Sequence, residues 1–143
     1  MTQTSQHNYG AALMRVSLGV ILLAHGLLKV FVFTVPGTVG FFASLGLPTI
    51  VAYLTIFGEI AGGAALIIGA YTRLVALLSV PLLLGATWAH LGNGWVFSNQ
   101  GGGWEFPLLL VVLAIAVALQ GGGALALRKI PLLDALIPEP LKA

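Results

Sequence analysis

Charged residues are scarce in this 143-residue chain, and cysteine is absent. Asp, Glu, Lys and Arg together make up 7% of the residues, whereas an ordinary soluble domain has about 25%. Hydrophobic residues account for 59%, and the mean hydropathy is +1.05. This composition excludes an ordinary water-soluble domain. It predicts an integral membrane protein whose main partner is the lipid bilayer.

The lack of cysteine excludes disulfide bonds, thiolate metal sites, cysteine-bound iron–sulfur clusters and dithiol redox chemistry. Any electron transfer would therefore need a bound organic cofactor, a haem or a partner protein. The net charge of +2 comes from six basic and four acidic residues, which is too small an excess to indicate nucleic-acid binding. The polar start of the chain lacks the positive region of a secretory signal, so we interpret the first apolar run as a retained membrane span.

Four apolar segments of about 20 residues, the length that crosses a bilayer as a helix, are separated by Gly, Pro and charged residues. The predicted spans lie near residues 13–34, 49–70, 73–91 and 105–127. The predicted fold is all-α, an integral-membrane antiparallel four-helix bundle over residues 13–127. A polar tail at 1–12 precedes the bundle, and an interfacial tail at 128–143 follows it.

The connections between the spans differ in length and composition. VPGTVG at 35–40 predicts a turn after the first span, because Pro36 cannot continue a helix and Gly37 tolerates positive φ. FFASLGLP predicts a short amphipathic segment before the second span. The longest connection, 91–104, is rich in Gly, Asn and Trp, and it either covers the mouth of the bundle or dips into it.

Basic residues predict the orientation of the chain. An up-and-down topology places Arg15, Arg73, Arg128 and Lys129 on one side of the membrane as anchors. By the positive-inside rule, this side is the cytoplasm. Both termini are then cytoplasmic, and the two longer loops face outside.

Two opposite charges lie at matching depths in the first two spans. Lys29 follows Arg15 by 14 residues. Glu59 precedes Arg73 by the same 14 residues on the antiparallel neighbour. Both charges therefore lie about 21 Å from the inner basic boundary. Because a charge in the hydrocarbon region costs about 2.5–3.5 kcal/mol, we predict an ion pair between Lys29 and Glu59.

Further ionisable residues fall near this level. His25 lies one helical turn before Lys29 on the same face, where its ring can also bond Glu59. His90 ends the third span within about a turn of the same level. Glu105 opens the fourth span on the outer side. The sequence thus predicts a polar pocket in the outer half of the bundle, with these five residues as binding candidates.

Simpler interpretations of the same residues stay open. The ion pair can serve as an internal salt bridge that fixes helix register, and Glu105 can serve to complement the dipole of its helix. Gly58 and Gly62 have a G-x-x-x-G spacing, and Gly63 follows them. These three glycines predict close helix packing near Glu59, with room for a ligand as the alternative.

Metal and haem ligation are not supported by the spacing. His25 lies about 10 Å deeper than His90 by helix rise, which argues against bis-histidine haem ligation. No metal site is predicted, because no His-x-x-x-His or Glu-x-x-His pair occurs on one helix.

Over about residues 13–125, the chain resembles the DoxX family of small bacterial four-helix membrane proteins. The resemblance lies in RVSLGVILLAHGLLKV, FFASLGLP, FGEIAGGAALIIGAYTRLVAL and LGNGWVFSNQGGGWEFPLLL. It implies a multi-pass protein of the bacterial inner (plasma) membrane. The family is named for a subunit of a thiosulfate:quinone oxidoreductase, and relatives are thought to act beside redox enzymes. The residues that match the family pattern are Arg15, His25, Lys29, Glu59, Gly62, Gly63 and Arg73.

Three functions are compatible with these observations. The first is a redox-associated subunit that binds a quinone or a similar small amphiphile in the polar pocket, beside a redox-enzyme partner. The second is a small-solute or proton-coupled carrier, for which four short spans require a homo-oligomer or a very small solute. The third is a purely structural membrane subunit. The sequence does not decide among them, or whether the chain itself is catalytic.

Overall fold

The computed structural model describes residues 2–127 and 134–141. Within these residues the protein is helical and has no β-strand, which confirms the predicted all-α class. The α-helices are α1 (Gln3–Phe31), α2 (Val35–Ser44), α3 (Thr49–Ile68), α4 (Thr72–His90) and α5 (Glu105–Gln120). Short 3-10 helices lie at Leu91–Asn93, Asp134–Leu136 and Glu139–Leu141.

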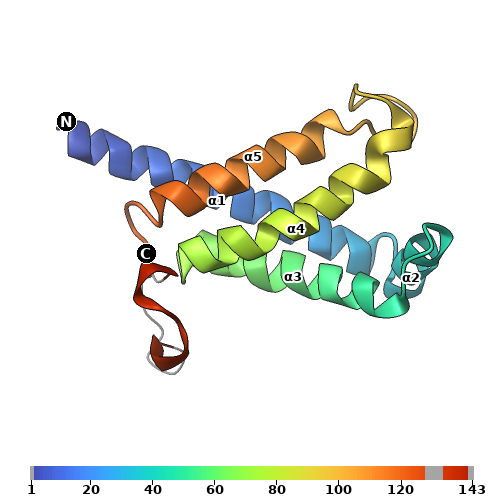
Figure 1. Cartoon of the computed structure of the whole chain (residues 1–143), viewed down its shortest axis with the longest axis horizontal. Coiled ribbons are helices and arrows are strands. Elements are labelled where there is room, and N and C mark those ends of the chain that lie inside the picture. Colours follow the sequence, from blue (N-terminus) through green and yellow to red (C-terminus); the bar gives the residue numbers. More distant parts are fainter. Residues whose placement is uncertain (1, 128–133, 142–143) are drawn as a thin grey trace.

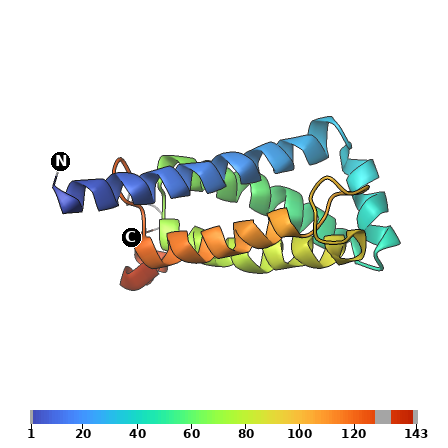
Figure 2. The ribbon, with the colours of Figure 1, turned by 90° about the horizontal axis from the view of Figure 1, so that it is seen from above.

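The four longer helices alternate in direction and pack as two pairs (Figures 1 and 2). α1 packs along α3, and α4 packs along α5, with further contacts between α3 and α4 and between α1 and α5. The short helix α2 lies against α1 and α3. The N-terminus and the C-terminal segment lie near one end of the molecule, whereas α2 and the α4–α5 connection lie at the other end.

The helices are apolar and carry apolar side chains on their outer faces. Among the described residues, α1, α3 and α4 with its following 3-10 turn are long and apolar enough to cross a membrane. Large exposed side chains such as Phe57, Leu78 and Leu109 cover the outside of the molecule. An apolar outer surface of this extent is unfavourable in water and suits lipid, so the protein is a membrane protein.

The fourth predicted span is shorter than expected. Helix α5 has 16 residues and ends at Gln120, whereas the prediction extended it to residue 127. Three consecutive glycines follow, and Gly121 and Gly123 both have positive φ. Glycine disfavours the helix interior and readily adopts this backbone region, which ends the helix early.

The first helix begins earlier than expected. Helix α1 already begins at Gln3, so most of the predicted polar tail at 1–12 is helical. The side chain of Thr2 accepts a hydrogen bond from the Ser5 N–H at 3.3 Å and caps the helix. The Asn8 carbonyl accepts a hydrogen bond from Ala124, which follows α5, so these polar turns are part of the fold.

The turn predicted at 35–40 is also misplaced. The chain reverses at Thr34, whose φ is 63°, and Pro36 and Gly37 lie in the first turn of α2. Proline is tolerated there because the first N–H groups of a helix have no partner within the helix. The Thr34 hydroxyl accepts from the Gly37 N–H at 3.3 Å and fixes this start.

Glycines bring α1 and α3 into backbone contact. A Cβ atom added to Gly63 would lie 2.5 Å from the Leu23 nitrogen and 2.7 Å from the Gly19 oxygen. A Cβ added to Gly26 would lie 2.6 Å from Ile60. The α1–α3 interface therefore has no space for a side chain at Gly63. Small residues of this kind allow the backbones of membrane helices to approach closely.

The two other glycines predicted at helix contacts face α4. A Cβ added to Gly58 would lie 2.9 Å from Leu82, which is a tight contact. A Cβ added to Gly62 would lie 3.6 Å from Val75, which is an ordinary van der Waals distance. The G-x-x-x-G pair therefore does not form the closest helix contact, which belongs to Gly63.

Candidate functional site

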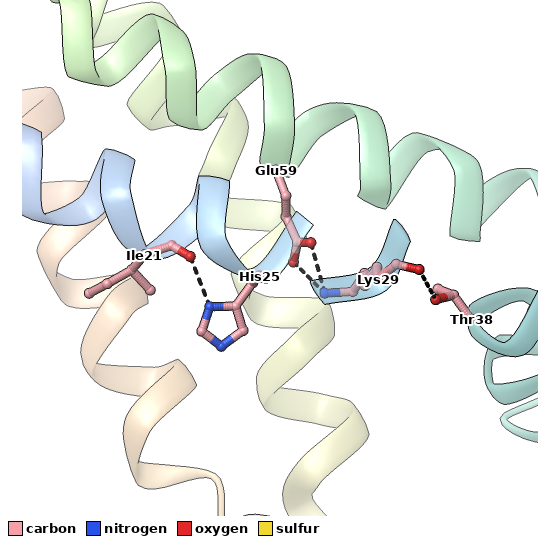
Figure 3. Close-up of polar contacts among 5 residues, drawn as sticks. All are labelled: Ile21, His25, Lys29, Thr38 and Glu59. Atoms are coloured by element: carbon pink, nitrogen blue, oxygen red, sulfur yellow. Dashed lines mark hydrogen bonds and ion pairs between the residues drawn. The ribbon is translucent and has the colours of Figure 1, made fainter. Parts of the chain in front are cut away.

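Lys29 of α1 and Glu59 of α3 form the predicted ion pair (Figure 3). The Lys29 Nζ atom lies 2.8 Å from Oε1 and 2.7 Å from Oε2 of Glu59. The Glu59 side chain is 6% exposed and that of Lys29 is 18% exposed. Charge-assisted hydrogen bonds to both carboxylate oxygens compensate part of the cost of burying the two charges.

The surrounding backbone holds this pair in place. Gly26 lies beside Glu59, and a Cβ at Gly26 would lie 3.1 Å from the Glu59 Cβ. The Lys29 carbonyl lies near the end of α1, where carbonyl groups lack partners within the helix. It accepts a hydrogen bond from the Thr38 hydroxyl of α2 at 3.1 Å (Figure 3). Helix α2 thus docks on the turn that carries the lysine.

His25 is close to the pair but does not bond Glu59 in the described part of the chain. Its Nδ1 atom lies 2.8 Å from the Ile21 carbonyl oxygen, one turn earlier on α1 (Figure 3). A carbonyl only accepts, so Nδ1 carries the hydrogen and Nε2 of a neutral ring is left as an acceptor. The ring stacks on Phe106 of α5, with a centroid distance of 6.2 Å. The local carbonyl competes successfully for the ring nitrogen that we expected to reach Glu59.

His90 organises the connection between α4 and α5. Its Nδ1 atom lies 3.0 Å from the carbonyl oxygens of both Gly101 and Gly102. The Asn93 side-chain amide donates to the same two carbonyls at 2.9 Å. Nδ1 therefore carries the hydrogen here as well, and Nε2 of the neutral ring remains available as an acceptor.

One cavity of about 240 Å³ brings His25, Lys29, Glu59 and His90 together. Apolar residues of α1, α4 and α5 form much of its wall. Phe97, Gly102 and Gly103 of the α4–α5 connection also line it, so this connection covers the cavity. We call this space the polar cavity.

Glu105 does not line the polar cavity. Its Oε1 atom accepts a hydrogen bond from the Phe97 N–H at 2.8 Å. Glu105 lines a neighbouring groove instead. The carboxylate satisfies a backbone donor of the connection, and it lies at the helix N-terminus, where the helix dipole favours a negative charge. The structure therefore does not bring Glu105 to the cavity that the other four residues share.

Arg15 is not a surface anchor, because it is 1% exposed. Its guanidinium donates to the carbonyls of Leu66 and Ile67 at 2.6 and 2.8 Å. It also donates to the carbonyls of Gly122 and Ala124 at 2.8 and 3.2 Å. The carbonyls at the end of α3 carry the partial negative charge of a helix C-terminus, which compensates the buried cation. Arg15 thus clamps the end of α3 to the segment after α5.

The other predicted anchors lie elsewhere. Arg73 lies in the first turn of α4 and donates to the Pro140 carbonyl at 3.3 Å. Arg128 and Lys129 lie outside the described residues. The interfacial position of the C-terminal tail stays a prediction.

Three residues near the cavity were not identified from the sequence. Phe97 and Phe106 line it, and Asn93 shapes the turn that covers it. The aromatic residues of the stretch WVFSNQGGGWEF signal an interfacial loop, but nothing in that pattern indicates which rings face inward.

These features define an all-helical membrane protein with a small polar cavity that ionisable side chains from three helices line. The chain belongs to the DoxX family, whose sequence model matches residues 10–92, and this confirms the predicted family. The chain is 36% identical over 118 residues to "Putative oxidoreductase CatD" of Bacillus subtilis (strain 168). The aligned residues cover 82% of this chain and 84% of that protein. No solved structure matches the chain.

Proposed function

We propose that this protein is a redox-associated membrane protein that binds the head group of a quinone, or of a similar small amphiphile, in the polar cavity. The observation that carries the proposal is the convergence of His25, Lys29, Glu59 and His90 from three helices on one space. A purely structural ion pair explains Lys29 and Glu59, but it gives no reason for two histidines to line the same cavity. Ionisable residues inside a membrane protein most often mark a functional site.

The cavity offers the hydrogen-bonding groups that such a head group needs. Two oxygens of Glu59 receive hydrogen bonds from the Lys29 ammonium, which has three N–H donors and so keeps capacity for a ligand carbonyl. The Nε2 atoms of His25 and His90 are acceptors suited to a ligand hydroxyl. Figure 3 shows the second ring nitrogen of His25 turned away from both Ile21 and Glu59. Phe97 and Phe106 supply apolar rings beside these polar groups.

We assign ligand binding and proton exchange to this chain and electron transfer to a partner enzyme. The chain has no cysteine for a dithiol or a cysteine-bound iron–sulfur cluster. Histidine, lysine and carboxylate side chains can donate or accept protons at a bound head group. The oxidoreductase name of the Bacillus subtilis relative supports a redox context for the site.

The same proposal places α1, α3, α4 and α5 across the bacterial inner membrane, with both termini in the cytoplasm. At 16 residues, α5 is about 24 Å long, somewhat shorter than a typical hydrocarbon core. Local thinning of the bilayer accommodates such a helix at modest cost. Arg73 is in the first turn of α4, and this end of α4 lies at the end of the molecule that carries both termini. This supports a cytoplasmic position for that end.

Analysis of the molecules that co-purify in mild detergent tests the proposal. We expect mass spectrometry to find a quinone retained by the wild-type protein. The H25L variant should lose it by at least about tenfold, because the ring is one wall of the cavity. H7L is the matched control, since His7 is an exposed histidine of α1 outside the cavity. Absence of any retained amphiphile, or equal retention by both variants, would overturn the proposal.

A further inference from the structure

A second concave surface lies beside the polar cavity. It is an open apolar groove of about 470 Å³ on the early turns of α5, where Leu108, Leu109 and Val112 form one wall. Trp95 of the α4–α5 connection lines it as well. Leu109 and Val112 are 61% and 58% exposed, so the groove opens sideways onto the apolar surface of the helix bundle.

Phe97 and Phe106 line both the groove and the polar cavity. Phe106 stacks on His25, which also lines the polar cavity. The Phe97 backbone is held by Glu105, which also lines the groove. These two aromatic residues therefore form the boundary between the polar cavity and the groove, whose only ionisable lining residue is Glu105 among the described residues.

The sizes of the two spaces fit one ligand with two unlike parts. Sites that hold whole drug-sized ligands have volumes of about 300–1,000 Å³. The polar cavity, at about 240 Å³, is smaller than this range and has room for a small polar head group. The remainder of an amphiphile must lie outside it, and the adjoining groove offers an apolar surface.

We propose that this groove, the tail groove, holds the apolar tail of the amphiphile whose head group occupies the polar cavity, with the tail passing between Phe97 and Phe106. This inference rests on the proposed function. It adds that the ligand enters sideways from the bilayer and that an apolar tail is part of what the protein recognises. The carboxylate of Glu105 at the groove disfavours an anionic amphiphile, because like charges repel.

A photoreactive probe tests this placement. The probe is a benzoquinone with an alkyl tail that ends in a diazirine, applied to the full chain in lipid nanodiscs. We expect saturable cross-links concentrated in residues 95–112, with competition by the same tailed quinone lacking the diazirine. V112W should reduce these cross-links by at least about tenfold, because the indole takes up part of the groove and obstructs the tail. L119W is the matched control, since Leu119 is an exposed α5 residue outside the groove.

Binding of the tail-less benzoquinone, measured in parallel, separates the two proposals. The inference predicts that the control variant L119W, at a residue that lines neither space, leaves this binding unchanged. Saturable binding of the tail-less ring together with cross-links spread over the outer faces of all helices would overturn the tail groove and leave the proposed function standing. Absence of saturable binding for both compounds would overturn the proposed function and the tail groove together.

Discussion

At the scale of single residues, each charge of the Lys29–Glu59 pair depends on the other. Both ammonium contacts to the carboxylate are shorter than 3 Å, and Glu59 is almost fully buried. Removal of one partner leaves the other charge uncompensated in an apolar bundle, whereas removal of both charges leaves none. Removal of one partner is therefore expected to cost more stability than the intact pair contributes.

We expect E59Q to lower the free energy of unfolding by about 3 kcal/mol, because Lys29 keeps its charge and loses its counter-ion. The double variant K29M/E59Q should recover most of this loss, since it contains no unpaired charge. Thermal or denaturant unfolding in detergent measures both effects. Equal stability of E59Q and wild type, or a double variant as unstable as E59Q, would contradict this account of the pair.

Arg15 gives a second residue-scale prediction. R15M should lower the free energy of unfolding by at least about 3 kcal/mol, because four carbonyl contacts of a buried cation are lost. R73M is the matched control, since the described contact of Arg73 is one longer hydrogen bond to Pro140. Thermal or denaturant unfolding in detergent measures the stability of both variants. An R15M loss as small as that expected for R73M would contradict a stabilising role for the four Arg15 contacts.

At the scale of the helices, close approach of α1 and α3 sets the geometry of the ion pair. Gly63 of α3 meets the backbone of Leu23 and Gly19, and neither backbone atom can move aside as a flexible side chain would. Gly62, the next residue before it, has ordinary space toward Val75. The two adjacent glycines therefore have different tolerances for a side chain.

We expect G63A to be destabilised by about 1–3 kcal/mol, because the added methyl group forces α1 and α3 apart. G62A should be neutral or more stable by up to about 1 kcal/mol, since alanine is favoured over glycine within a helix. Melting temperatures in detergent compare the two variants directly. Equal effects of the two substitutions would show that the α1–α3 contact is looser than the structure indicates.

Much of the helix pattern was predictable, because apolar runs and glycines mark where helices cross a membrane and where they end. The depth of Lys29 and Glu59 was predictable for a similar reason: equal residue counts along antiparallel helices give equal heights. The start of α1 was not, since its first turns are polar and are held by a cap and by contacts with the segment after α5. Pro36 was predicted to lie in a turn but lies in the first turn of α2. The prediction failed because proline interrupts a helix but is also common at the start of one.

The candidate site divides in the same way. Periodicity places His25 on the face of Lys29, but a nearby carbonyl decides which way its ring turns. The sequence position of Glu105 indicates a helix start, but the free N–H group of Phe97 decides where its carboxylate lies. The contact of Glu105 with the α4–α5 connection depends on the folded path of that connection. This path is irregular, so it cannot be predicted from the periodicity of the sequence.

At the scale of the whole molecule, the proposed topology places the α4–α5 connection outside and the N-terminus inside. The chain has no native cysteine, so single introduced cysteines report accessibility without background. In intact cells, we expect a membrane-impermeant maleimide to label S98C in the connection and to leave T4C unlabelled until the membrane is permeabilised. The reverse pattern would invert the orientation, and labelling of both sites in intact cells would contradict the antiparallel arrangement across the bilayer.

The central claim is that the Lys29–Glu59 pair belongs to a ligand site and is not merely a structural contact. The most direct measurement compares saturable binding of a tail-less benzoquinone by wild type and by K29M/E59Q, both in folded form. We predict that the double variant remains folded, because no unpaired charge is left, and loses binding by at least about tenfold. A folded double variant that binds the quinone as tightly as wild type would contradict the claim and leave the pair a purely structural contact.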